Sequence, residues 1–103
     1  MKEGSEGAVT RNVTIVNAKG LHARASAKFV AQAEKWAADV TVGYGDETVS
    51  ACSIMGLMLL GAGVGATVTL SATGVQAQEA VEALAALVAA GFSENDGALA
   101  RAG

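Results

Sequence analysis

The chain has 103 residues and a formal net charge of −3, and 51% of its residues are hydrophobic although only 4% are aromatic. This length accommodates one small domain with a core of aliphatic side chains. The acidic balance and the four aromatic residues argue against nucleic-acid binding, which favours basic surfaces and exposed aromatic platforms. The single Cys52 excludes an internal disulfide and indicates a reducing compartment, and residues 1–10 contain no apolar signal-peptide core. These features predict a cytoplasmic protein.

The N-terminal part combines a polar, glycine-rich segment with a strand and a helix. Residues 1–9 are expected to be flexible. Valine and isoleucine alternate with polar residues over 10–16, which predicts a strand. Alanine-rich residues 23–37 favour a helix. One face of this helix carries the apolar residues that we expect in the core: Phe29, Ala33 and Trp36.

The middle of the chain predicts a hairpin and a short helix. Residues 39–44 alternate and read as a strand, and Gly45-Asp46 is a turn signal that returns the chain into a further strand over 47–51. Ser53 is well suited to cap the helix predicted over 54–60. The glycine-rich segment that follows, residues 61–65, is not a dinucleotide-binding motif because it precedes a strand, so we expect a flexible turn there.

The C-terminal part predicts a fourth strand over 66–72 and a last helix over 75–90, with Gly91 as its C-cap. The buried stripe expected on this helix consists of Ala77, Val81, Leu84, Ala85 and Val88. Residues 91–103 are expected to form a flexible tail, which leaves 10–90 as the domain. The order β-α-β-β-α-β-α predicts a two-layer α+β fold, an open-faced sandwich with three helices on one face of a four-stranded sheet.

One uncharged stretch raises the question of a membrane span. Residues 54–70 are almost wholly apolar, but the run has about 17 residues, at the short limit for a bilayer. Four glycines interrupt it, and no lysine or arginine flanks it closely. We therefore expect no membrane insertion.

His22 is the only histidine and lies where the first predicted helix begins. Helix N-termini bind anions through free backbone N–H groups, and the guanidinium of Arg24 suits phosphate. Five of the seven basic residues lie between positions 11 and 35. A neutral imidazole is nucleophilic, so this arrangement predicts a histidine that accepts and passes on a phosphoryl group. The alternative is a capping or surface histidine. One histidine and one cysteine supply too few ligands for a metal site.

Two motifs resemble a known family. Gly20-Leu21-His22-Ala23-Arg24 is similar to the phosphorylation-site motif of HPr, the phosphocarrier of bacterial phosphoenolpyruvate-dependent phosphotransferase systems. The segment from Ser53 to Met58 resembles the second signature of that family, around its regulatory serine. The order of elements agrees as well. The resemblance covers residues 10–90 and implies an antiparallel sheet with strand order 1-4-2-3.

The resemblance also implies roles for particular residues. His22 would carry the phosphoryl group on Nδ1, receive it from enzyme I and pass it to a IIA protein or domain, and Arg24 would steady the group during transfer. Ser53 would be phosphorylated by HPr kinase/phosphorylase in lineages that have it. The residues implied in partner binding are Ile54, Met55 and Met58. The resemblance implies a covalent relay protein without a cofactor, rather than a self-sufficient enzyme, and a monomer.

Two departures and one alternative accompany the resemblance. The family usually has proline directly after the arginine, where this chain has Ala25, and often a basic residue before the serine, where this chain has Cys52. Alanine is a good helix former, so the site is expected to persist. The alternative is a regulatory module of the nitrogen-related phosphotransferase branch, which binds targets according to its phosphorylation state.

Overall fold

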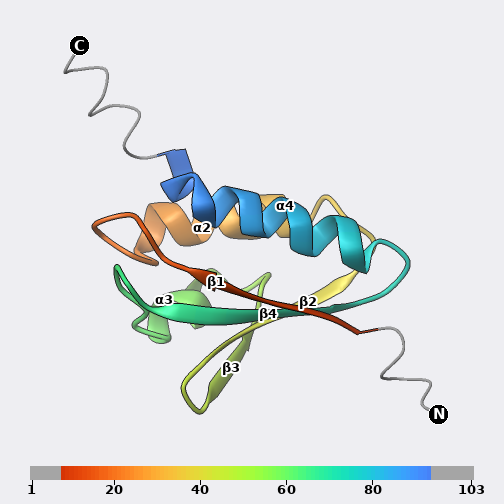
Figure 1. Cartoon of the computed structure of the whole chain (residues 1–103), viewed down its shortest axis with the longest axis horizontal. Helices are drawn as coiled ribbons and strands as arrows, with labels where there is room; N and C mark the ends of the chain where they lie inside the picture. Colours follow the sequence, from red (N-terminus) through yellow and green to blue (C-terminus); the bar gives the residue numbers. More distant parts are fainter. Residues whose placement is uncertain (1–7, 94–103) are drawn as a thin grey trace.

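The structure, a computed structural model, describes residues 8–93. It consists of a four-stranded antiparallel sheet covered by helices (Figure 1). The elements in chain order are β1 (Val9–Thr14), α2 (Ala23–Ala33), β2 (Asp39–Tyr44), β3 (Glu47–Ser50), α3 (Ile54–Leu59), β4 (Thr67–Thr73), α4 (Ala77–Ala89) and the short 3-10 helix η1 (Gly91–Ser93). The strand order is β1-β4-β2-β3, and each neighbouring pair is antiparallel. The predicted α+β fold and strand order are therefore confirmed.

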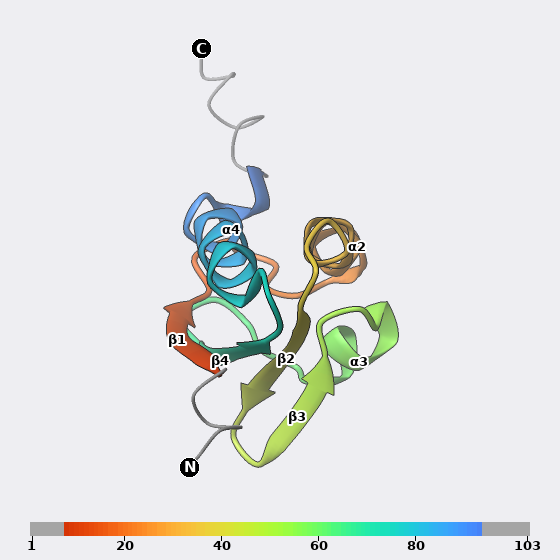
Figure 2. The same cartoon turned by 90° about the vertical axis from the view of Figure 1, so that its right-hand side faces the viewer.

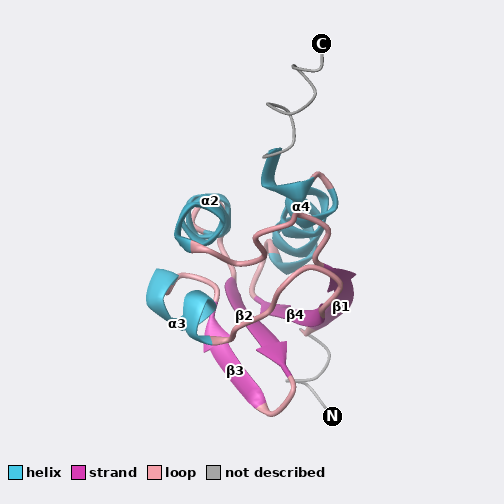
Figure 3. Ribbon diagram, turned by 90° about the vertical axis from the view of Figure 1, so that its left-hand side faces the viewer, coloured by secondary structure: helices cyan, strands magenta, loops and turns pink. Residues whose placement is uncertain are grey.

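The helices form a second layer over the sheet. Helices α2 and α4 lie side by side above the strands (Figure 2), while α3 packs against α2 and β3 at the edge of this layer (Figure 3). Strand β4 shows the reason for two layers, because Val68, Leu70 and Ala72 are buried while Thr67 and Thr69 are exposed on the other face. The five residues predicted as the buried stripe of the last helix are all buried on α4.

The predicted helix over 23–37 is too long, since α2 ends at Ala33. The backbone N–H of Ala37 donates to Oε1 of Gln76 at 2.8 Å, and the carbonyl of Ala37 accepts from the backbone N–H of Gln76 at 3.0 Å. These contacts with the start of α4 override the local helix propensity of alanine. Trp36 is consequently half-buried at the margin of the core, where its indole N–H donates to Gln32.

Two further boundaries differ from the prediction by two residues, and the other differences are of one residue. Strand β1 ends at Thr14 rather than at 16. Ile15 still exchanges hydrogen bonds with residues 65 and 66, which precede β4, whereas Val16 is 53% exposed. Helix α4 begins at Ala77 rather than at 75, after a loop in which Val75 is 88% exposed.

The C-terminal end of the described chain folds back onto the domain. Ala90 is the C-cap of α4, and Gly91, directly after it, has a φ of +65°, as is typical of a glycine that ends a helix. Residues 91–93 were assigned to the tail, but they form η1, and the Phe92 side chain is fully buried. The packed domain therefore extends at least to residue 93. The rest of the expected tail and most of the expected N-terminal segment lie outside residues 8–93.

Between residues 8 and 93, the structure contains no helix long and apolar enough to span a membrane.

Candidate functional site

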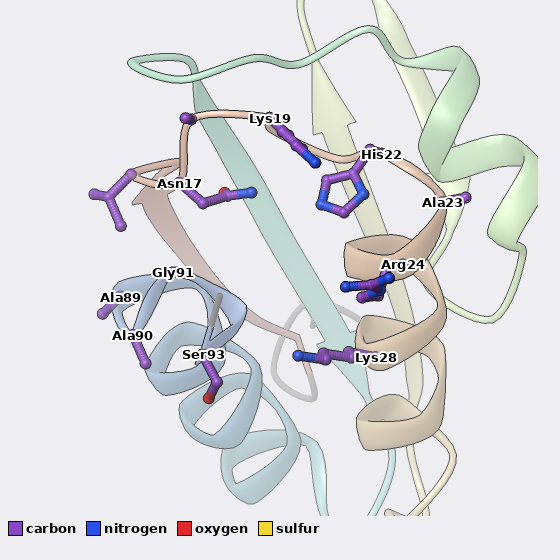
Figure 4. Close-up of a pocket in the computed structure, with 12 residues that line it drawn as sticks. Asn17, Lys19, His22, Ala23, Arg24, Lys28, Ala89, Ala90, Gly91 and Ser93 are labelled. Carbon is purple, nitrogen blue, oxygen red and sulfur yellow. The ribbon is translucent and has the colours of Figure 1, made fainter. Parts of the chain in front are cut away.

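A hollow of about 830 Å³ lies between the β1–α2 loop, the start of α2 and the end of α4. His22 and Arg24 both line it, and Figure 4 shows the imidazole of His22 extending into the space in front of α2. The structure thus brings together the two residues that the sequence predicts for phosphoryl transfer.

His22 is the N-cap of α2, as predicted. Its backbone is extended, with φ −77° and ψ −179°, and its carbonyl accepts the first helical hydrogen bond from Ser26 at 2.9 Å. The imidazole is half-buried and makes no capping hydrogen bond to the helix. The amides of residues 23–25 precede the first helical donor, so they carry the partial positive charge of the helix N-terminus next to the imidazole.

The loop before His22 is held by contacts that sequence analysis did not identify. The side-chain amide of Asn17 donates to the carbonyl of Gly20 at 2.9 Å, and the hydroxyl of Ser26 donates to the carbonyl of Leu21 at 3.2 Å. Asn17 and Ser26 are the two buried polar residues of the described chain. Both side chains donate to carbonyls of the loop that leads to His22, and these hydrogen bonds hold its backbone in place. The polar residues on either side of the Gly20–Arg24 motif were the signal from which these contacts could have been predicted.

The glycine-rich segment after α3 supports the same loop. The carbonyl of Ala62 accepts from the backbone N–H of Leu21 at 3.1 Å, and Ala62 is buried. Gly20 has a φ of +64°, and a Cβ there would lie 2.6 Å from the carbonyl oxygen of Ala62. The segment over 61–65 was interpreted only as a flexible turn, but it also holds the backbone that leads to His22.

The walls of the hollow favour an anion. Lys19, Arg24 and Lys28 line it, and the lining residues, all within the described chain, include no acidic side chain. Arg24 and Lys19 are exposed, whereas Lys28 is half-buried. Three cations next to a helix N-terminus create a positive potential that attracts phosphate. Lys19 and Lys28 extend the predicted pair of His22 and Arg24.

Ser53 and the predicted docking residues lie apart from this hollow, on α3. The hydroxyl of Ser53 accepts from the backbone N–H of Gly56 at 2.9 Å, which confirms the predicted N-cap. Ile54, Met55 and Met58 are 41%, 65% and 40% exposed. Leu59, which sequence analysis did not include, is 77% exposed. We call these four residues the α3 patch. Such a cluster is typical of an interaction surface.

No group of three or more histidine, cysteine, aspartate or glutamate residues with the spacing of a metal site occurs in the described part of the chain.

Comparisons with known proteins agree with this geometry. A family model described as the PTS HPr component phosphorylation site matches residues 9–90. Phosphocarrier protein HPr of Cupriavidus necator is 48% identical over 86 residues, which cover 84% of this chain and 97% of that protein. Phosphocarrier protein NPr of Shewanella violacea is 44% identical over 84 residues, which cover 82% of this chain and 92% of that protein.

Solved structures show the same similarity. The phosphocarrier protein HPr from Bacillus anthracis superposes with a TM-score of 0.76 at 42% identity, over 79% of this chain and 96% of that one. HPr-C-His from Thermoanaerobacter tengcongensis gives a TM-score of 0.79 at 40% identity, over 82% and 96% of the two chains. The chain belongs to the HPr family of phosphocarrier proteins of the phosphotransferase system.

Proposed function

We propose that this protein accepts a phosphoryl group on Nδ1 of His22 from enzyme I, ultimately from phosphoenolpyruvate, and passes it to a IIA protein. The observation that carries the proposal is the position of His22 at the N-terminus of α2, in a hollow lined by three cations. Membership of the HPr family supports enzyme I as the phosphoryl donor and a IIA protein as the acceptor.

The chemistry needs one nucleophile and a site for negative charge. The lone pair of Nδ1 attacks phosphorus, and the bond between phosphorus and the donor breaks as the new N–P bond forms. No proton has to leave Nδ1 if the ring proton is on Nε2. The backbone amides of residues 23–25 and the guanidinium of Arg24 then stabilise the phosphoryl oxygens. The reverse sequence delivers the group to the acceptor.

The α3 patch supports a docking role. Partners must bring their own phosphoryl site to His22, and α3 packs directly against α2, the helix that His22 caps (Figure 3). Exposed methionine side chains are flexible and adapt to different partner surfaces, and Ile54 adds apolar area beside them. We assign docking of enzyme I and IIA proteins to Ile54, Met55 and Met58, with Leu59 as an additional contact.

The nitrogen-related branch is the second candidate function. It is favoured by the 44% identity to the NPr of Shewanella violacea, which is close to the 48% identity to the HPr of Cupriavidus necator. The two branches differ in the IIA protein that accepts the group. Transfer to a sugar-specific IIA, but not to a nitrogen-related IIA, would assign the chain to sugar transport, and the opposite preference would assign it to regulation.

The relay can be tested with Arg24→Ala. We expect the unsubstituted protein to take up phosphate from phosphoenolpyruvate and enzyme I and to pass it to a IIA protein. Because Arg24 is exposed and acts on developing charge, its replacement should slow transfer roughly tenfold or more while the melting temperature stays nearly unchanged. Stopped-flow or quench-flow transfer rates and thermal denaturation measure the two effects. Normal transfer with a large loss of stability would make Arg24 structural.

We also propose that Ser53 is a regulatory phosphorylation site, modified by HPr kinase/phosphorylase where that enzyme is present. The substitution Ser53→Asp should keep the fold, since a helix N-terminus tolerates an anion, but should slow phosphotransfer from enzyme I, because negative charge appears next to the α3 patch. Ser53→Ala is the matched control, because it removes the cap, worth about 1 kcal/mol, without adding charge. If Ser53→Asp transferred the phosphoryl group as fast as Ser53→Ala, this result would count against a regulatory role of Ser53.

A further inference from the structure

Lys28 makes a hydrogen bond that joins the two walls of the hollow. It lies one helical turn after Arg24 on α2, and its Nζ donates to the carbonyl oxygen of Phe92 at 2.7 Å. Figure 4 shows Lys28 extending from α2 toward the turn that contains Ser93. The side chain is half-buried, so its ammonium occupies a restricted place at the margin of the hollow.

The acceptor of this bond belongs to an unusual turn. Gly91, Phe92 and Ser93 all have positive φ, at 65°, 57° and 62°, although residues with side chains rarely adopt this conformation. The fully buried ring of Phe92 and the hydrogen bond from the backbone N–H of Ser93 to Ala90 hold the turn in place. A backbone conformation of this kind persists only where its surroundings impose it, and such sites cluster near functional sites.

The turn also lies where the C-terminal end of α4 affects the electrostatic potential of the hollow. Helix α4 points its C-terminal end at the hollow, because Ala89, Ala90 and Gly91 line it. Unpaired carbonyls give a helix C-terminus a partial negative charge, which disfavours an anion nearby. The N-terminus of α2, on the opposite wall, carries a partial positive charge and favours an anion. An ammonium that binds the Phe92 carbonyl reduces the negative potential of α4 at the place where a phosphoryl group would arrive.

We propose that Lys28 is a positioning residue of the His22 site: bound to the Phe92 carbonyl, its ammonium neutralises the C-terminal end of α4 and supplies a fixed positive charge that orients the phosphoryl group. This inference rests on the function proposed for His22. An ammonium has three N–H donors, so the bond to Phe92 leaves donors for phosphoryl oxygens. Because the side chain is already ordered by that bond, little further rotamer entropy is lost when the phosphoryl group arrives.

Three variants test the proposal. Lys28→Met keeps a long apolar stem and removes the charge, Lys28→Arg restores the charge, and Lys35→Met removes the same charge from an exposed residue outside the hollow. Each protein is phosphorylated with phosphoenolpyruvate and enzyme I, and the phosphohistidine signal is followed by phosphorus NMR as a function of pH. Transfer to a IIA protein and thermal unfolding are measured on the same samples.

We expect the pH midpoint of the phosphohistidine signal to rise by about half a unit in Lys28→Met, because loss of a nearby cation favours the protonated state. Transfer should slow roughly threefold to tenfold. Lys28→Arg should restore both properties, and Lys35→Met should match the unsubstituted protein.

An unchanged midpoint in Lys28→Met would overturn the proposal, and a lower melting temperature alone would make Lys28 a structural cap of α4. If the unsubstituted protein gives no phosphohistidine signal, the function proposed for His22 is itself overturned, and this inference falls with it.

Discussion

Replacement of His22 by alanine is expected to abolish phosphorylation by enzyme I and phosphoenolpyruvate. His22 is the only histidine of the chain, and it caps the helix whose amides and arginine face the hollow. No other imidazole can form the N–P bond. The loss of phosphate uptake should therefore be complete within detection, and it can be measured by intact-mass spectrometry after incubation with both reagents.

The same substitution should leave the fold intact. The imidazole is half-buried and does not cap α2 through its side chain, so the free energy of unfolding should change by no more than about 1 kcal/mol. His22→Gln provides a second variant that keeps a polar side chain without a nucleophilic nitrogen. Undiminished phosphate uptake in either folded variant would show that another residue is the acceptor.

A second large effect is expected from Gly20→Ala, which should destabilise the protein. The positive φ of Gly20 disfavours any side chain, and the added Cβ would lie 2.6 Å from the carbonyl oxygen of Ala62 and 2.7 Å from Cα of Gly63. Both are main-chain atoms, so the segment over 61–65 has to move. We expect a loss of about 3 kcal/mol or more from strain and overpacking together. Thermal or denaturant unfolding followed by circular dichroism measures it.

Two other glycines separate the causes of this loss. Gly61 also has a positive φ, +69°, but a Cβ there meets no atom within 4 Å, so Gly61→Ala should cost about 1 kcal/mol. Gly63 has neither a positive φ nor a close neighbour, and Gly63→Ala should be nearly neutral. A stability loss in Gly20→Ala no larger than that in Gly61→Ala would show that contact with the segment over 61–65 is not what holds the loop before His22.

Local patterns predicted much of this structure. The alternation of valine and threonine in β4 identifies both faces of the sheet, and the apolar stripe of α4 is buried as predicted. Ser53 was placed correctly because an N-cap depends on hydrogen bonds within one helical turn. His22 and Arg24 were expected together for the same reason, since they are neighbours at one helix start. Each of these features depends on residues that are close together in the sequence.

Contacts between distant residues account for what was missed. Helix α2 stops early because Ala37 binds Gln76, and Lys28 meets Phe92 across 64 positions. The sequence of the segment over 61–65 is that of an ordinary glycine turn, and only the folded structure shows that the backbone N–H of Leu21 donates to the carbonyl of Ala62. Neither periodicity nor propensity encodes such pairs, because each depends on how the elements pack in the finished fold.

The central claim is that His22 carries the phosphoryl group, and the most direct measurement locates that group on the unsubstituted protein. After incubation with phosphoenolpyruvate and enzyme I, the mass should increase by one phosphoryl group that is labile in acid and stable in alkali. Nitrogen and phosphorus NMR should place this group on Nδ1 of His22. An acid-stable phosphate on a hydroxyl group, or no mass increase with an enzyme I that phosphorylates an authentic HPr, would contradict the account.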